Sequence, residues 1–305
     1  MRGLPTDPAA RGLLDDAAVL PTTGADIVLT HDMLVEGVHF LSTDPPGDVA
    51  WKLLAVNLSD LAAKSARPRG VLLGFCLGDE AGDAEFVVGL RFALAAMDVA
   101  LLGGDTVSAR GPRILSLTAI GIAPVGGAPS RAGAQPDDDV WVSGTIGDAG
   151  PGLRIARGDR EGPAGLLARY RRPDPRIALG IALGPHVHAM MDVSDGLLID
   201  TGRLAAASGV AVAIDLDALP LSDAYVDFAG TDRDARLAAA TAGDDYELLF
   251  AAPRDAQAAI GACAIASGTP VVRIGSVRAG AGLHLHDCDG PVPLPGRLGY
   301  EHGAT

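Results

Sequence analysis

Lysine is nearly absent from this sequence, and its scarcity excludes one common kind of nucleotide site. The chain has only Lys52 and Lys64, and neither stands in a GK[ST] motif. A Walker A loop, in which such a lysine binds the nucleotide phosphates, is therefore excluded. A protein of this composition that binds ATP must meet the phosphate charge with metal ions, arginine side chains and backbone amides.

Cysteine and long apolar runs are scarce as well. Cys76, Cys263 and Cys288 are far apart and form no CxxC pair, which argues against a disulfide framework or a zinc knuckle and favours a reducing compartment. The first eight residues contain no apolar core of signal-peptide length. The apolar run at residues 92–102 is interrupted by Asp98 and is too short to cross a membrane. We therefore expect a soluble, cytoplasmic protein.

Basic side chains are outnumbered by acidic ones. The chain has 38 aspartate and glutamate residues against 24 lysine and arginine residues, which gives a formal net charge of -14. This balance argues against a nucleic-acid surface, which needs clustered basic residues to replace counterions. It suits a protein that collects cations, although solubility alone explains the charge equally well. We expect neither a nucleic acid nor a membrane as a partner.

The length and the apolar pattern predict two domains. The chain has 305 residues, of which 48% are hydrophobic, so it can bury a large core. Apolar strands alternate with helical patterns; we expect strands at residues 27–29, 71–77, 99–102, 114–122, 140–142, 210–214, 248–252 and 271–274, and helices at 50–65, 84–97, 177–183 and 197–207. Residues 123–139 are rich in Pro, Gly and Asp and form the expected junction. We predict an α/β or α+β fold with domains at residues 1–125 and 136–305.

Acidic residues recur where an apolar segment is expected to give way to a turn. They are Asp15, Asp16, Asp32, Asp60, Asp105, Asp192 and Asp195. Taken singly, each is more simply a helix cap or a turn residue. Several such positions can meet in one crevice beyond the strand ends, where unpaired carboxylates repel one another unless a divalent cation neutralises them. Magnesium favours carboxylate oxygens as ligands, so the pattern indicates a magnesium site.

The segment GGDT at residues 103–106 permits two interpretations. Two glycines would let a nucleotide approach the backbone, with the Asp105 carboxylate beside it. Alone, the motif is more simply a tight turn after the strand at 99–102, which is what we predict. The histidine pairs His186/His188 and His284/His286 have strand spacing but no acidic cluster near them, so we interpret them as solvated edges.

Taken in order, the motifs resemble thiamine-monophosphate kinases, in the superfamily of aminoimidazole ribonucleotide synthetase. The matching segments extend from about Leu14 to Tyr300. They are DDAA at 15–18, THDMLVEGVHF at 30–40, AVNLSDLAA at 55–63, GGDT at 103–106, SRAGA at 130–134, DVSDGL at 192–197, GDDYEL at 243–248 and the closing Gly299-Tyr300. Each motif is modest alone, whereas this order over this length is highly specific.

The resemblance implies an enzyme that uses ATP and several magnesium ions and works as a homodimer, its first domain binding ATP and metal and forming the dimer barrel. The implied metal ligands are Asp16, Thr30, His31, Asp32, Asp60, Asp105, Asp192 and Asp195. ATP would be bound by Gly104, Asp105, Arg131 and Ser194, and thiamine monophosphate by His39, Asp244 and Tyr300. No catalytic base is needed, because the acceptor phosphate has a second pKa of about 6 and is already nucleophilic.

A few positions depart from the family pattern. His31 stands where a serine or threonine is usual, Lys64-Ser65 replaces a pair ending in glycine, Val107 replaces a threonine, and Asp244 is one methylene shorter than the usual glutamate. The family's glycine-rich opening segment is missing, so we expect the sequence to start late. Two alternatives stay open: another ATP-using member of the superfamily, or a non-catalytic relative that binds thiamine phosphates without converting them.

Overall fold

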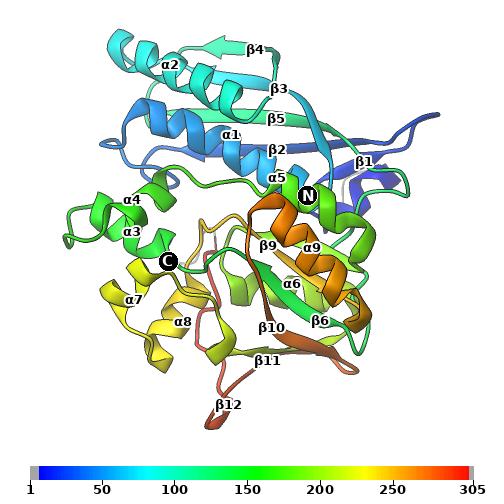
Figure 1. The fold of residues 1–305 in the computed structure, drawn as a ribbon. Coiled ribbons are helices and arrows are strands. Elements are labelled where there is room, and N and C mark those ends of the chain that lie inside the picture. Colours follow the sequence, from blue (N-terminus) through cyan, green and yellow to red (C-terminus); the bar gives the residue numbers. More distant parts are fainter. Residues whose placement is uncertain (1–6, 302–305) are drawn as a thin grey trace.

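The computed structural model describes residues 7–301 and places two mixed α/β units one above the other (Figure 1). The first unit has a five-stranded sheet in the order β1-β2-β5-β3-β4. Its elements are η1 (Pro8–Leu13), β1 (Ala18–Leu20), β2 (Ile27–Val35), α1 (Pro46–Ala63), β3 (Arg67–Cys76), α2 (Glu80–Ala96), β4 (Leu101–Val107) and β5 (Ile114–Ile122). Only β3 and β4 pair in parallel; the other pairs are antiparallel.

Helix α1 is buried along most of its length because it lies between the two units. It packs on α2, β2 and β5 in the first unit and on α5 and β7 in the second. Pro46 fits its first turn, and Leu53, Leu58 and Leu61 are completely buried. The opposite face of the first sheet is open: Met33 is 48% exposed and Leu72 41% exposed. This sheet therefore has one covered face and one half-apolar, exposed face.

The second unit is built on a seven-stranded sheet in the order β12-β11-β8-β10-β6-β9-β7. Its strands are β6 (Asp139–Ser143), β7 (Ala189–Val193), β8 (Ala211–Asp215), β9 (Glu247–Ala252), β10 (Val271–Arg278), β11 (Gly282–Asp287) and β12 (Gly290–Val292). Its helices are α3 (Ala149–Ala156), α4 (Ala164–Arg171), α5 (Ile177–Leu183), η2 (Gly184–His186), α6 (Leu197–Ser208), η3 (Leu216–Ala218), α7 (Asp223–Ala229), α8 (Arg233–Thr241), η4 (Arg254–Ala256) and α9 (Gln257–Ser267).

Helices cover both faces of the second sheet (Figure 1). Alternate residues of its central strands enter different apolar clusters, as the pleat requires: Met191 packs with α6, whereas Met190 packs with α5 and α9. Buried on both faces, β6, β7 and β9 are apolar along nearly their whole length. The predicted α/β class is confirmed. In the described part of the chain, no helix combines the length and apolarity that crossing a membrane requires.

The prediction of a turn at GGDT was wrong. Strand β4 passes through Gly103 and Gly104 and continues to Val107, paired in parallel with β3. A Cβ atom on Gly104 would lie 2.0 Å from the carbonyl oxygen of Leu73, so glycine is needed for close pairing of the two strands. The segment at residues 123–138 links the two sheets; the end points of the predicted domains stay predictions.

Candidate functional site

A cavity of about 1180 Å³ is lined by residues from both units. Its wall contains all the predicted site residues except Gly104 and Asp105, namely Asp16, Thr30, His31, Asp32, His39, Asp60, Arg131, Asp192, Ser194, Asp195, Asp244 and Tyr300. These residues come from the loop before β1, from β2 and the loop after it, from α1 and β7, and from the loops that flank the second sheet. The fold thus brings distant segments of the sequence to one cavity.

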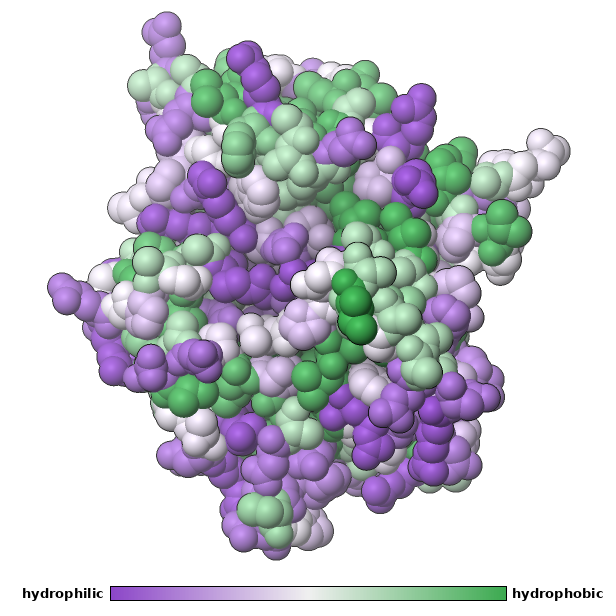
Figure 2. Space-filling model, viewed as in Figure 1, coloured by the Kyte–Doolittle hydropathy of each residue, from purple (hydrophilic) through white to green (hydrophobic). Residues whose placement is uncertain are grey.

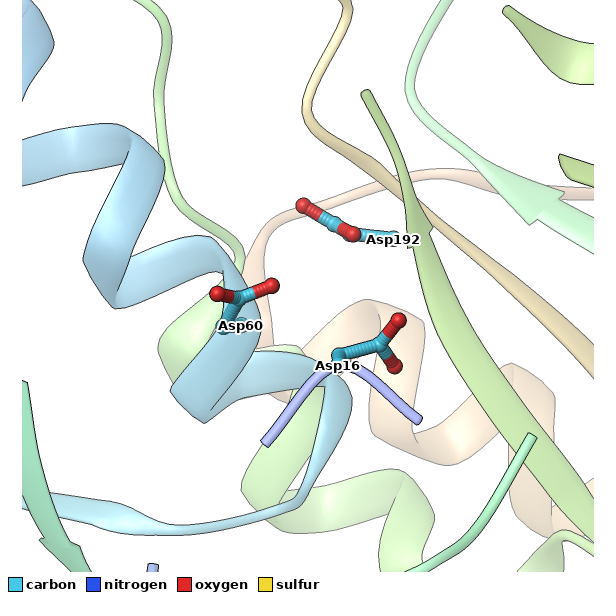
Figure 3. A group of neighbouring side chains, drawn as sticks. All are labelled: Asp16, Asp60 and Asp192. Atoms are coloured by element: carbon cyan, nitrogen blue, oxygen red, sulfur yellow. The ribbon is translucent and has the colours of Figure 1, made fainter. Parts of the chain in front are cut away.

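Three carboxylates meet at the centre of this wall (Figure 3). Asp16 lies in the loop before β1, Asp60 on α1 and Asp192 on β7, and one oxygen of each lies within 4.8 Å of the others. Asp32 on β2 raises the pKa of Asp60 from nearby. The expected turn position was wrong for Asp32, because β2 continues to Val35. Asp60 lies within α1, in agreement with the helix predicted at residues 50–65.

Burial and mutual repulsion make the ionised forms of Asp60 and Asp192 unfavourable. Burial, with the neighbouring Asp16, raises the pKa of Asp192 to about 8. Burial also raises the pKa of Asp60 well above its usual range, and Asp32 and Asp192 add to the effect. Their direct partners are uncharged, because Ser59 donates to Asp192 at 2.6 Å and the Thr30 hydroxyl donates to Asp60. A set of hard oxygen donors with unbalanced negative charge fits magnesium.

These pKa shifts predict how the stability of the metal-free protein depends on pH. The Asp192 carboxyl has a pKa near 3.8 when unfolded and about 8 when folded, so the folded state holds an extra proton between these values. Its stabilising effect is complete below the lower value and is lost as the pH rises through the higher one. In EDTA, we expect the melting temperature by calorimetry to fall between about pH 5.5 and about pH 8.5. A melting temperature that rises over this interval would contradict the account.

Asp16 differs from its two neighbours because protein cations contact both of its oxygens. Lys64 Nζ lies 2.6 Å from Asp16 Oδ2, and Arg131 pairs with Asp16 Oδ1. Lys64 also lies 2.6 Å from Asp15 Oδ1, and Arg11 lies 2.6 Å from Asp15 Oδ2. Burial alone would raise the pKa of Asp15, but the two cations lower it to about 2. One corner of the cluster is therefore already neutralised by the protein.

A second buried lysine joins the residues predicted to bind the acceptor. Lys52 Nζ lies 2.7 Å from Asp244 Oδ2 and donates to the backbone oxygen of His39 at 3.1 Å. The ammonium lies 4.3 Å from the centre of the Tyr170 ring. The hydroxyl of Tyr246 donates to Asp244 Oδ1 at 3.2 Å. Both oxygens of Asp244 are thus held, across the boundary between the two units.

Asp200 orders the loop after β7. Its Oδ2 accepts from the backbone amides of Ser194 at 3.1 Å and Asp195 at 3.0 Å. Burial raises the pKa of Asp200 to about 6, while the cation of Arg203 opposes the rise. Arg203 also lies 2.6 Å from Asp195, and the backbone amide of Tyr300 donates to the Asp195 carbonyl at 2.8 Å. The loop that carries Ser194, a predicted ATP contact, and Asp195, a predicted metal ligand, is therefore fixed without metal.

Asp105 and Gly104 lie away from this cavity. They are on β4, whose residues are all exposed, at the far edge of the order β2-β5-β3-β4. At about 4.8 Å per strand, three spacings separate Asp105 from β2 by about 14 Å. Within one chain, the structure does not bring Asp105 to Asp16, Asp60 and Asp192.

His31 points to the other side of β2 from Thr30 and Asp32, because side chains alternate along a strand. It is exposed, and its Nδ1 lies 2.8 Å from Thr118 Oγ1 on β5. Its role as a metal ligand stays a prediction. His31 therefore borders the cavity from the open side of the first sheet. Asp105 is on this same side, because its register through β3 and β5 leads to Met33.

Comparisons with known proteins agree with this arrangement. The family "AIR synthase related protein, N-terminal domain" matches residues 14–123, and its C-terminal counterpart matches residues 135–288. The thiamine-monophosphate kinase of Caulobacter vibrioides is 44% identical over 305 residues, which cover 97% of this chain and 86% of that protein. The chain belongs to the thiamine-monophosphate kinase family.

Two solved structures extend the comparison. The thiamine-monophosphate kinase from Stenotrophomonas maltophilia K279a is 41% identical, with a TM-score of 0.79 over 88% of this chain and 90% of that one. AaThiL complexed with AMPPCP and TMP is 29% identical, with a TM-score of 0.83 over 95% of this chain and 91% of that one. The resemblance inferred from the motifs is confirmed, and the thiamine-monophosphate kinase fold extends through both units.

The site residues predicted from the sequence of this thiamine-monophosphate kinase did not include several residues that the structure places in the site. Lys52 and Lys64 each contact a predicted site carboxylate, and Asp200 holds the loop of two predicted ligands. One signal was available: in a chain whose other basic residues are arginines, the only two lysines stand twelve positions apart in and just after a single helix. Their contacts depend on the packing of two domains, which the sequence pattern does not reveal.

Proposed function

We propose that this protein transfers the γ-phosphoryl group of ATP directly to thiamine monophosphate, giving thiamine diphosphate and ADP. The observation that carries this proposal is the 44% identity to a thiamine-monophosphate kinase over 97% of the chain, combined with the acidic cluster at the wall of one cavity. The related AaThiL structure, complexed with AMPPCP and TMP, supports an ATP site and an acceptor site together.

The main obstacle to this reaction is charge. The acceptor phosphate and the γ-phosphate are both anions, and two unit charges 4 Å apart repel by about 4 kcal/mol in a partly screened site. Asp16, Asp32, Asp60 and Asp192, with the Thr30 hydroxyl and Asp195, would hold several magnesium ions. These ions would neutralise the phosphates and fix them in line. The aspartates act as ligands, and none has to remove a proton from the acceptor.

Arg131 and Ser194 are the proposed contacts of ATP within this chain. Arg131 is half-buried, and its guanidinium pairs with Asp16 at the edge of the metal cluster. An arginine at this place can donate to phosphate oxygens while the carboxylates beside it hold cations. Ser194 follows β7 in the loop that Asp200 orders, so its position is fixed before the nucleotide binds.

His39, Asp244 and Tyr300 are the proposed contacts of thiamine monophosphate. Thiamine carries an aminopyrimidine and a cationic thiazolium ring, and the Asp244 carboxylate offers an acceptor for groups of this kind. Lys52 and Tyr246 hold its two oxygens, so the carboxylate direction is set by residues of both units.

Replacing Lys52 with methionine should weaken acceptor binding more than turnover. The substitution leaves the Asp244 carboxylate and the His39 carbonyl without a charged donor worth about 1.5–3 kcal/mol, a loss of roughly tenfold to 100-fold in binding. Steady-state kinetics should show the KM for thiamine monophosphate rising by that factor, with the KM for ATP little changed. Equal increases in both would assign Lys52 a general structural role.

We also propose that the protein is a homodimer through its first sheet. Strand β1 pairs with β2 only at residues 27–29, and the outer edge of β4 has no partner strand within the described chain. Leu101, Leu102 and Val107 on β4 are about half exposed. Figure 2 shows hydrophobic residues, interspersed with hydrophilic ones, at the top of the molecule, where Figure 1 places α2 and β4. Pairing of β4 with β2 of a second copy would close a barrel and bring Asp105 towards the partner's cluster.

Light scattering at micromolar concentration should therefore give about twice the chain mass of 30.9 kDa. Leu101→Lys places a charge in the proposed edge pairing and should shift the mass towards one chain. Val125→Lys, at a fully exposed position outside both sheets, is a matched control and should leave the mass unchanged. A wild-type mass of one chain would exclude the barrel.

A coupled assay of ADP formation tests the proposed function. ADP release with ATP and magnesium should require thiamine monophosphate. Release without it would favour another ATP-using member of the superfamily. Tight binding of thiamine monophosphate with no ADP release would indicate a non-catalytic relative.

A further inference from the structure

Lys64 lies directly behind the acidic cluster and is completely buried. Its ammonium group uses three contacts: the Asp15 and Asp16 carboxylates, each at 2.6 Å, and the backbone oxygen of Met190 at 3.2 Å. Met190 belongs to β7, the strand that carries Asp192. The contacts with Asp15 and Met190 are hydrogen bonds and the contact with Asp16 is an ion pair, so the charge is held between the loop before β1, the end of α1 and β7.

The charges around the cluster are distributed unevenly. At the Asp16 corner, Lys64 and Arg131 contact both carboxylate oxygens. At the opposite side, the donors to Asp60 and Asp192 among residues 7–301 are only hydroxyl groups, those of Thr30 and Ser59. The protein thus supplies cations to one corner and leaves the carboxyl groups of the other corner without a cationic partner.

We propose that Lys64 is a positioning residue that acts as a built-in cation of the metal cluster. It neutralises the Asp15–Asp16 corner and holds Asp16 beside Asp60 and Asp192 before any metal binds, so divalent cations are needed chiefly at the Asp60–Asp192 side. This inference rests on the proposed function, because it assumes that the cluster binds magnesium. It assigns Lys64 a role that a divalent cation can partly replace.

The chain contains a matched control for this inference. Lys52 is the only other lysine, is buried in α1, which ends directly before Lys64, and also pairs with an aspartate. Its partner Asp244 is not among the three clustered carboxylates. Losing either lysine breaks a buried ion pair, but only the loss at Lys64 leaves an extra negative charge within the group of three clustered carboxylates.

Thermal unfolding of wild-type protein, Lys64→Met and Lys52→Met in EDTA and in increasing MgCl2 tests the proposal. In EDTA, the melting temperature of the Lys64→Met protein should lie well below that of wild type. In MgCl2, most of this difference should disappear. The half-saturating magnesium concentration of this variant should be lower than that of wild type by about tenfold, the factor for 1.4 kcal/mol. For the Lys52→Met protein, the decrease in melting temperature relative to wild type should be the same in EDTA and in MgCl2.

Lys64→Gln is a second variant, neutral but able to donate a hydrogen bond, and should respond to magnesium as Lys64→Met does. Losses at Lys64 that are equal with and without magnesium would overturn the proposal, as would failure of both variants to fold at saturating MgCl2. If wild type and both lysine variants ignore magnesium while thiamine diphosphate is still made, the inference fails and the proposed function stands. A normal magnesium response without thiamine diphosphate formation would refute the function instead.

Discussion

Replacing Asp60 with asparagine is expected to lower phosphoryl transfer by about 100-fold or more, as when one preorganised electrostatic group is removed. Asparagine keeps the size of the side chain but removes one anionic ligand from the centre of the cluster. Thermal stability in EDTA should hold or rise, because burial and the neighbouring Asp32 and Asp192 raise the pKa of Asp60 well above its usual range. Turnover at saturating magnesium and the melting temperature in EDTA check both parts on one preparation.

Asp15→Asn is the matched control, with the opposite effect on stability. The pKa of Asp15 is lowered to about 2 although burial alone would raise it, because Lys64 and Arg11 stabilise the ionised form. That contribution is present above the unfolded pKa and is lost as the pH falls towards 2. At neutral pH, Asp15→Asn should therefore lower the melting temperature in EDTA. If the Asp60 variant also lost stability in EDTA, its carboxylate would be structural.

Replacing Asp105 with asparagine should also lower turnover by about 100-fold or more, although this residue lies about 14 Å from β2 of its own chain. The reason is that a second copy would bring Asp105 to the cluster. The metal-free melting temperature should change little, because Asp105 is exposed on β4. Near-normal turnover at saturating magnesium would refute the role.

Mixed dimers test whether Asp105 acts across the interface. In a dimer of one Asp60→Asn chain and one Asp105→Asn chain, one site combines both substitutions and the other has neither. Co-expression of the two inactive chains should therefore restore roughly a quarter of wild-type turnover if chains associate at random. Recovery should be absent if each site uses Asp60 and Asp105 of the same chain.

Much of the first sheet could be predicted from the sequence, but the length of its strands could not. The apolar run at residues 27–29 is only the start of β2, because the rest of the strand has one open face and carries Thr30, Asp32 and other polar residues. The glycines of β4 indicated a turn because glycine favours turns, whereas they are needed here for close pairing with β3. In both cases the tertiary setting determines the conformation.

The resemblance to a family named several carboxylates that the fold brings together, although their role as metal ligands stays a prediction. Asp16, Asp60 and Asp192 were predicted as ligands, and the fold places their carboxylate oxygens within 4.8 Å of one another. The cations that position them were not predicted, because Lys64 reaches Asp16 only after α1 packs against the loop before β1 and against β7. The place that we propose for Asp105 depends on a second chain, which no single-chain pattern describes.

Direct detection of the product tests the central claim. Purified protein incubated with ATP, thiamine monophosphate and MgCl2 should form thiamine diphosphate, separated by chromatography, with one ADP for each product molecule. EDTA should stop the reaction, and the Asp60→Asn protein should form product about 100-fold more slowly or less. Formation of ADP and inorganic phosphate without thiamine diphosphate, in the presence of MgCl2, would contradict direct transfer to the acceptor.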